Sequence, residues 1–168
     1  MISDLYMDTI DELMEAVDSC KFEDKEEVRT FVCNLTKLVY DYKMMGKLYD
    51  FYIQDVEYHK QNRRRIHGVE ELVHNVLDLC AEFPDLKADI ENVIVYKVDD
   101  TFYKIFRRLR YKGTNLGYSK YGPPTGKSLG DNCLNLSLMH LKKVEGQWKF
   151  VFEINSDSEG WIKEVETQ

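Results

Sequence analysis

Residues 131–155 read DNCLNLSLMHLKKVEGQWKFVFEIN, and this stretch decides the fold. From Asp131 to Val144 apolar side chains recur at alternate positions, as they do along a β-strand. Glu145–Gly146 then supplies a two-residue turn, and Trp148–Asn155 is predicted to return as the partner strand. The stretch therefore predicts a long antiparallel hairpin near the C-terminus.

Four further segments that precede this hairpin carry strand or loop signals. Alternating apolar and charged residues predict a strand from Leu86, a turn at Asp99–Asp100, and a second strand over residues 102–112. Residues 113–130 hold five of the nine glycines and two of the three prolines, which is typical of a loop. A short strand is also expected over Gln54–His59.

The first half of the chain has helical periodicity instead. Apolar residues recur at helical spacing over residues 10–17, 28–45 and 69–80. Asp24 with Glu27 three residues later is typical of a capping box at the start of the second helix. Helices followed by consecutive long strands predict an α+β domain, with the helices on one face of a mainly antiparallel sheet.

Length and charge exclude several classes of protein. With 168 residues the chain has the length of one domain. The net charge is -7, and residues 1–30 alone hold ten acidic and three basic residues, so the remaining body is neutral. A neutral body excludes general nucleic-acid binding, which needs clustered positive charge. Since the chain shows neither a targeting signal nor a membrane-length apolar run, we expect a cytoplasmic protein with reduced cysteines and no membrane partner.

The short motifs predict little chemistry by themselves. Gly122–Ser128 has three residues between its glycines where a phosphate-binding loop needs four, and two of them are prolines. The histidines and cysteines lack the spacings of metal ligands, so no metal site is predicted. Arg63–Arg65 is either a solvated basic loop or a site for an anionic group. His59 lies among Tyr52 and Tyr58, where it could be a neutral proton acceptor or a histidine bonded to the backbone.

Seven motifs occur in a fixed order between Val56 and Val165. They are V..H at Val56 and His59, a helix from Gly68 that ends in FPDL at 83–86, two acids at 99–100, GTN.G at 113–117, PTGK at 124–127, EG at 145–146, and D..G at Asp157 and Gly160. In this order they resemble the SnoaL-like polyketide cyclase family, within the nuclear transport factor 2-like superfamily. The resemblance implies a cone-shaped, strongly curved sheet wrapped around helices, with a pocket at its open end. We expect residues 24–168 to form this domain and residues 1–23 to be an added acidic helix.

The resemblance also marks where the cyclases hold their acid and base groups. The aspartate three residues before the D..G motif corresponds to Ile154, the loop histidine to Asn115, and the strand histidine to Ser137 or Met139. One positioned proton-transfer group contributes about 10²–10⁴ in rate. Cyclisation by the family mechanism is therefore not expected.

These positions lead us to expect a small-molecule-binding protein with an apolar pocket and no cofactor. Its ligand would be a small apolar or amphipathic molecule. The side chains expected to line the pocket are Tyr52, His59, Asn115, Asn135, Ser137, Phe152 and Ile154. Two alternatives remain: an enzyme of isomerase, dehydratase or hydrolase type with His59 as base, and a non-catalytic interaction module.

A homodimer through the sheet is a further expectation. Both faces of the strand at residues 131–141 carry apolar side chains, and only one face can meet the helices. Monomers rarely leave a large contiguous apolar patch exposed, and a two-fold interface is the commonest way to cover one.

Overall fold

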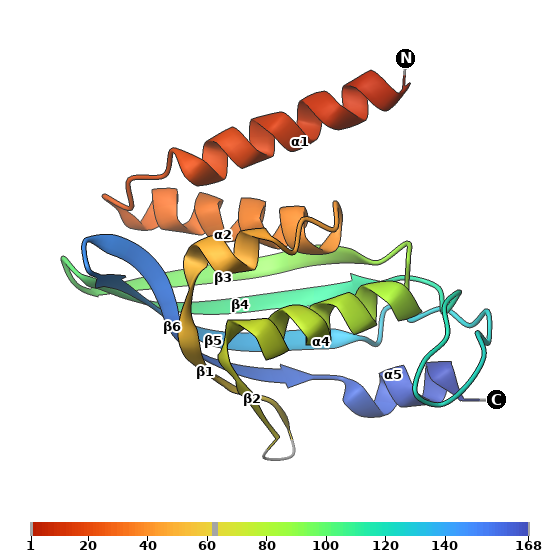
Figure 1. The fold of residues 1–168 in the computed structure, drawn as a ribbon. Helices are drawn as coiled ribbons and strands as arrows, with labels where there is room; N and C mark the ends of the chain where they lie inside the picture. The colour runs from red at the N-terminus through yellow and green to blue at the C-terminus, as the bar shows by residue number, and fades with distance from the viewer. Residues whose placement is uncertain (1, 62–63, 168) are drawn as a thin grey trace.

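In the computed structural model, which describes residues 2–61 and 64–167, helices come first and long strands later (Figure 1). The elements are α1 (Ile2–Asp18), α2 (Lys25–Tyr40), α3 (Lys47–Phe51), β1 (Tyr52–His59), β2 (Arg65–His67), α4 (Gly68–Glu82), β3 (Lys87–Asp99), β4 (Phe102–Lys112), β5 (Leu134–Val144), β6 (Gln147–Asp157) and α5 (Glu159–Glu166). The strands form one curved, unclosed sheet in the order β2-β1-β6-β5-β4-β3. All neighbouring strands in this sheet pair in antiparallel fashion, except β1 and β6, which are parallel. The predicted α+β architecture is confirmed.

Local sequence signals set most of the element boundaries. The Asp24 carboxylate accepts the N–H groups of the first turn of α2 at 2.8 and 2.9 Å, as the capping motif predicts. Glu145–Gly146 adopts φ angles of 49° and 83°, as a tight hairpin turn of the primed type requires. The second helix ends at Tyr40 rather than near Met45, because Lys43 takes a left-handed φ of 61° and its ammonium group bonds to the Tyr40 carbonyl.

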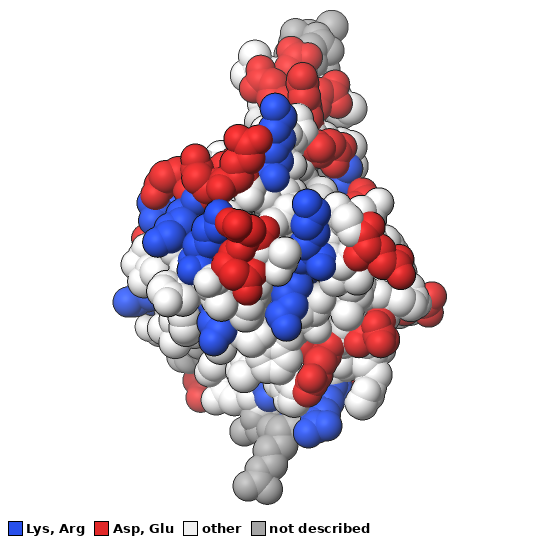
Figure 2. Space-filling model, turned by 90° about the vertical axis from the view of Figure 1, so that its left-hand side faces the viewer, with Lys and Arg blue, Asp and Glu red and all other residues white. Residues whose placement is uncertain are grey.

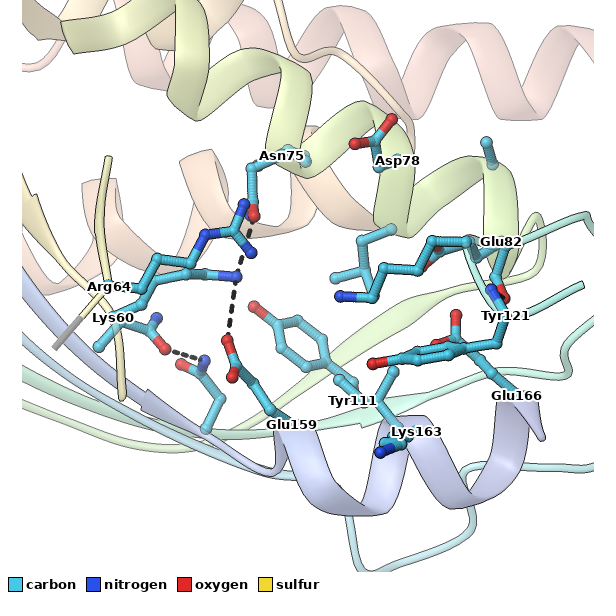
Figure 3. Close-up of a pocket in the computed structure, with 18 of the residues that line it drawn as sticks. Lys60, Arg64, Asn75, Asp78, Glu82, Tyr111, Tyr121, Glu159, Lys163 and Glu166 are labelled. Atoms are coloured by element: carbon cyan, nitrogen blue, oxygen red, sulfur yellow. Dashed lines mark hydrogen bonds and ion pairs between the residues drawn. The ribbon is translucent and has the colours of Figure 1, made fainter. Parts of the chain in front are cut away.

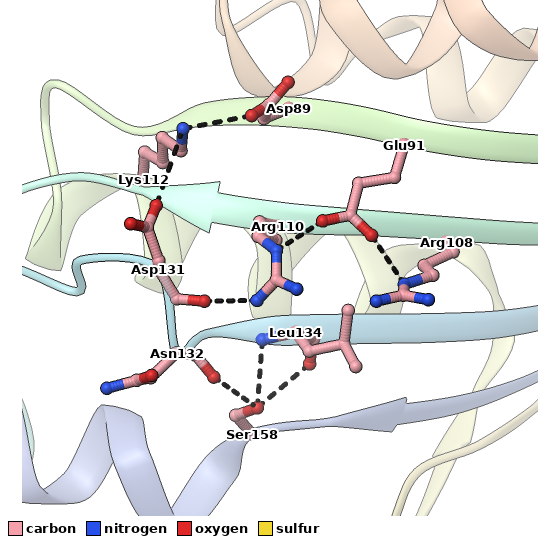
Figure 4. A network of polar contacts seen from close by, with 9 residues as sticks. All are labelled: Asp89, Glu91, Arg108, Arg110, Lys112, Asp131, Asn132, Leu134 and Ser158. Carbon is pink, nitrogen blue, oxygen red and sulfur yellow. Dashed lines mark hydrogen bonds and ion pairs between the residues drawn. The ribbon is translucent and has the colours of Figure 1, made fainter.

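One strand boundary and two additional elements also differ from the sequence-based expectation. The strand predicted from Asp131 begins at Leu134, where the Ser158 hydroxyl accepts the Leu134 N–H at 3.1 Å (Figure 4). Strand β2, with three residues, and helix α5, with eight, are both additional. The side chain of Asp157, the aspartate of the D..G motif, lies outside the described residues.

Helix α1 lies on α2, on the side away from the sheet (Figure 1). Ile10 and Val17 are buried, while the acidic side chains of the helix gather around its projecting end (Figure 2). Asp18 also pairs with Lys47 of α3 at 2.7 Å. Because the Asp18 carboxylate is half exposed, this pair contributes about 0–1 kcal/mol, so apolar burial is the main term that holds α1 in place.

The basic residues of β4 do not meet α1. Arg108 and Arg110 both pair with Glu91 on the neighbouring strand β3 (Figure 4). Lys112 pairs with Asp89 at 3.0 Å on the same strand. These pairs join β3 to β4.

No helix of the described chain is long and apolar enough to cross a membrane.

A β-bulge in β6 turns part of the last strand over. Phe150 pairs with Leu141 and Phe152 pairs with His140, so Val151 between them has no partner. Side chains alternate between the faces of a sheet, and one extra residue therefore moves every later side chain to the opposite face.

The bulge overturns part of the predicted pocket. Phe150 packs in the core, but Phe152 and Ile154 face outward, away from the helices. The two inward positions belong instead to Glu153 and Asn155, both buried.

Candidate functional site

A cavity of about 390 Å³ lies between α4, α5, the loop after β4 and the inner face of the sheet (Figure 3). This volume falls within the range of small-molecule sites. Tyrosine rings form much of its wall, and they are Tyr40, Tyr58, Tyr111, Tyr118 and Tyr121. The lining is therefore aromatic and polar, whereas the sequence led us to expect an apolar pocket.

One end of the cavity is closed by a lysine that bridges two helices. Lys60 Nζ donates to Asn75 Oδ1 of α4 at 2.9 Å and lies 3.6 Å from Glu159 Oε1 of α5 (Figure 3). Arg64 lines the same end. It belongs to the basic run identified in the sequence, of which Arg63 lies outside the described residues. Arg64 is exposed, as a solvated basic loop predicts, and it also lines the cavity, so both interpretations of this run stay open.

The opposite end of the cavity is acidic. Glu82 ends α4 and Glu166 ends α5, and both line this end (Figure 3). Burial, together with the hydrogen bond and charge of the Glu166 carboxyl and the charge of Asp78, raises the pKa of Glu82 to about 8; the charge of Lys120 opposes this rise. Burial also raises the pKa of Glu166. At neutral pH the pair therefore holds a proton.

Three polar side chains of β5 and β6 form the floor. Asn135 Nδ2 donates to Asn155 Oδ1 at 2.9 Å, and Asn155 Nδ2 donates to Ser137 Oγ at 3.3 Å. The Ser137 hydroxyl in turn donates to Asn135 Oδ1 at 3.2 Å. The two asparagines line the cavity, while Ser137 lies behind them.

A buried ion pair lies deeper, in a chamber of about 30 Å³ that shares Tyr40 and Tyr58 with the cavity. Glu153 is 2% exposed, accepts a 2.8 Å hydrogen bond from the Tyr52 hydroxyl, and lies 3.7 Å from Arg107 Nη2. The chamber has room for about one water molecule.

Arg107 is held by hydroxyl groups as well as by the carboxylate. Its two terminal nitrogens donate to Thr36 Oγ1 at 2.9 Å and Ser137 Oγ at 3.1 Å. Its Nε has no hydrogen-bond partner within the described residues. Burial opposes the charged guanidinium, but Glu153 and nearby tyrosines outweigh burial and raise the pKa of Arg107.

The environment changes the acidity of the groups around this ion pair. Burial raises the pKa of Glu153, although the charge of Arg107 and the hydrogen bond from the Tyr52 hydroxyl oppose the change. Burial also raises the pKa values of Tyr52 and Tyr58, with the Glu153 charge adding to the effect. The tyrosines thus remain hydrogen-bond donors at neutral pH. A buried acid with a raised pKa is typical of acid–base sites and also of structural ion pairs.

The structure brings together only part of the predicted site. Asn135 lines the large cavity, Tyr52 lines the inner chamber, and Ser137 connects the two regions. His59 is on the outer face, where Nε2 lies 2.6 Å from Glu57 Oε1 and the ring contacts Phe152. It cannot serve as a base in the cavity, because the odd positions at the end of β1 point outward.

Asn115 is buried but holds the loop rather than facing the cavity. Its amide nitrogen donates to the Glu82 and Gly117 carbonyls, both at 3.2 Å, and its oxygen accepts the Thr125 N–H at 2.8 Å. The Thr125 hydroxyl then donates to the Val165 carbonyl of α5 at 2.6 Å. Asn115 and the PTGK loop therefore position the helix that covers the cavity.

Sequence reasoning missed the charged residues of the interior. Arg107 was detectable, because Ile105, Arg107 and Leu109 share one face of a strand that is otherwise apolar there. Glu153 was not detectable from sequence, because the bulge decides which way its side chain points.

Within residues 2–61 and 64–167, no group of three histidine, cysteine, aspartate or glutamate side chains is arranged to hold a metal ion.

Comparisons with known proteins agree with this fold. A nuclear transport factor 2-like protein with a cystatin-like fold from Novosphingobium aromaticivorans superposes with a TM-score of 0.59 at 15% identity, over 82% of this chain and 84% of that chain. For Aln2 from a Streptomyces species the TM-score is 0.59 at 12% identity, over 82% and 92% of the two chains. For the hexachlorocyclohexane dehydrochlorinase LinA-type3 from Novosphingobium barchaimii it is 0.56 at 14% identity, over 72% and 77%.

These structural similarities show the fold alone, since all the identities are low. A comparison with curated proteins gave no match. The family model of the SnoaL-like polyketide cyclases matches residues 31–151, which is more than half of the chain. The chain therefore belongs to the SnoaL-like polyketide cyclase family, as its ordered motifs indicated.

Proposed function

We propose that the protein binds a small aromatic molecule with polar substituents in the cavity between α4 and α5. The observation that carries this proposal is the lining: tyrosine rings along the walls and hydrogen-bonding groups at both ends. Aromatic walls favour a planar ligand through ring contacts, and a few fixed polar groups set its orientation. Membership of a family whose name refers to a small-molecule reaction supports the same conclusion.

Filling the cavity should abolish this binding. Ala81 of α4 lines the cavity, whereas Leu77, one turn earlier on the helix, is 42% exposed and does not line it. We expect Ala81→Trp to weaken binding of one-ring aromatic compounds at least about tenfold, or about 1.4 kcal/mol. Leu77→Trp is the matched control and should bind as the unaltered protein does. Benzoate, benzamide and benzamidine are suitable probes, with binding measured by NMR titration.

Two outcomes would contradict the proposal. One is that none of the three probes binds the unaltered protein, and the other is that Ala81→Trp binds them equally well. Native mass spectrometry of protein purified without denaturation gives an independent measurement. A co-purifying small molecule should be present in the unaltered protein and in Leu77→Trp, and absent from Ala81→Trp.

Acid–base catalysis on a ligand is the second candidate function, and Glu153 is the observation that favours it. This buried carboxyl with its raised pKa takes the role first considered for His59. Carbon-bound hydrogen next to a carbonyl of the bound molecule should then exchange with D₂O, which NMR can follow. Exchange should rise with pH through the raised pKa of Glu153, since a base acts in its ionised form.

Glu153→Gln tests this role while it keeps the size of the side chain. We expect exchange to fall by about 10²–10⁴, the usual effect of losing one positioned base. The control is Glu91→Gln on the outer surface of the sheet, which should exchange normally. Unchanged exchange in Glu153→Gln would leave binding as the function.

We further propose that the protein forms a homodimer through the outer face of the sheet. Cross-strand neighbours there make one apolar row, from Ile94 through Phe106 and Leu138 to Ile154. Phe106 of β4 lies within this row and is 50% exposed. A second copy related by a two-fold axis would bury the same row on both chains.

Phe106→Glu should convert the dimer to a monomer, because a charge at the centre of an apolar interface is costly to bury. Sedimentation velocity at micromolar concentration measures the change. Leu116→Glu, at an exposed leucine of the loop after β4, is the control and should remain dimeric. A monomeric unaltered protein would disprove this proposal.

A further inference from the structure

The acidic end of the cavity is built from two helix ends that are distant in sequence. Glu82 and Glu166 converge there from α4 and α5, and their carboxyl groups are within hydrogen-bonding reach of one another (Figure 3). Glu166 is only 3% exposed, and its Oε1 meets no donor group of the described chain. A buried acceptor without a donor is uncommon in folded proteins and calls for a partner.

Within the described residues no ion pair holds a counter-ion on these carboxyls, although the charge of Lys120 opposes the rise in both their pKa values. Asp78 lies one turn before Glu82 and adds negative charge. Lys120 and Lys163 line the same cavity, but their ammonium groups lie over the Tyr121 ring, at 5.0 and 5.8 Å from its centroid. Among the described residues neither lysine forms an ion pair with a carboxylate. Tyr111 and Tyr118 also line the cavity.

Two carboxyls in one desolvated site cannot both ionise without a cation between them. In the protein without ligand, a proton shared by the two carboxyls keeps one of them neutral. A ligand that brings its own positive charge and N–H groups would replace the proton and satisfy Glu166 Oε1. An amidinium is well matched, because its planar N–H groups can donate to two carboxylates at once.

We propose that the Glu82–Glu166 end of the cavity binds the protonated nitrogen group, amidinium or ammonium, of an aromatic ligand. This inference rests on the proposed function, because it names the class of molecule that the cavity takes. The aromatic part of the ligand lies along the tyrosine walls toward Asn135 and Asn155. The cationic group lies between the ends of α4 and α5.

The charge of the ligand links its binding to pH. The pKa of Glu82 is about 8 in the free protein, so at pH 6 the carboxyl pair retains its proton. Cation binding favours the ionised form and expels that proton, so affinity must rise as the pH rises toward 8. We expect benzamidine, which stays cationic throughout this range, to bind at least about tenfold more tightly at pH 8 than at pH 6.

Isothermal titration of the full chain with benzamidine, benzamide and benzoate tests the inference. Benzamidine should bind at least about tenfold more tightly than its neutral isostere benzamide at pH 8. Glu166→Gln and Glu82→Gln should each remove this preference. Glu164→Gln is the matched control on the exposed side of α5 and should keep it.

The outcomes separate this inference from the proposed function. If benzamide or benzoate binds in the cavity as tightly as benzamidine, the cavity remains a ligand site but the cation site is wrong. Benzamidine binding that is unchanged between pH 6 and pH 8 would also overturn it. That second measurement needs only the unaltered protein, so it stands even where a substitution at Glu166 prevents folding.

Discussion

Arg107→Met is expected to lower the free energy of unfolding by about 3–5 kcal/mol, because it leaves the Glu153 carboxylate buried without its counter-charge. Both side chains are almost fully enclosed, and the arginine also donates to Thr36 and Ser137. Methionine fills a similar volume but restores none of these contacts. Urea denaturation of the variant and of the unaltered protein measures the difference.

The loss of stability in Arg107→Met should depend on pH, and the titration of Glu153 decides at which pH the loss is larger. Burial already raises the pKa of this carboxyl, and removing the guanidinium removes the main opposing charge, so the pKa rises further. An acid whose pKa is raised by folding favours the folded state at low pH, and this contribution disappears as the pH rises through the folded-state value. The defect should therefore be smaller at pH 5 than at pH 8.

Two variants complete this test. Arg108→Met removes the neighbouring arginine, which is half exposed and paired with Glu91, so it should cost only about 0–1 kcal/mol. Arg107→Met combined with Glu153→Leu should recover much of the stability, because apolar residues often replace a buried ion pair without loss. A defect in Arg107→Met that is no larger than in Arg108→Met would show that the pair does not stabilise the fold.

The fold could be predicted from sequence because its signals are local. The Asp24 cap, the Glu145–Gly146 turn and the two periodicities each act within a few residues, and each has the structure its pattern indicates. The bulge at Val151 is different. It depends on how β6 pairs with β5, and no residue type at that position marks it.

The candidate site was less predictable for the same reason. One unpaired residue turns Phe152 and Ile154 outward and Glu153 inward. The strand was therefore predicted correctly, but the face on which these side chains lie was not. The acidic pair of Glu82 and Glu166 exists only because α4 and α5 end side by side, and α5 itself was not foreseen. Contacts between distant elements follow from packing, which periodicity does not describe.

Gly117 fixes how closely the loop after β4 approaches α4, and this approach also shapes the acidic end of the cavity. A β-carbon at Gly117 would lie 1.8 Å from the Ala81 carbonyl oxygen, which is far inside the distance that two such atoms tolerate. The N–H groups of Leu116 and Gly117 both bond to the Glu82 carbonyl, at 3.2 and 3.1 Å. The loop cannot move away from the helix without losing these bonds.

Gly117→Ala is therefore expected to cost about 3 kcal/mol, the upper part of the usual range for inserting a methyl group into a packed site. It should also weaken ligand binding, since the loop carries Lys120 and Tyr121 of the cavity wall. Gly160→Ala in α5 is the control, because nothing lies within 4 Å of its added carbon and alanine favours helix. Thermal unfolding and benzamidine titration measure both effects. If Gly117→Ala matches Gly160→Ala in both, the close approach of the loop to α4 has no part in holding the site.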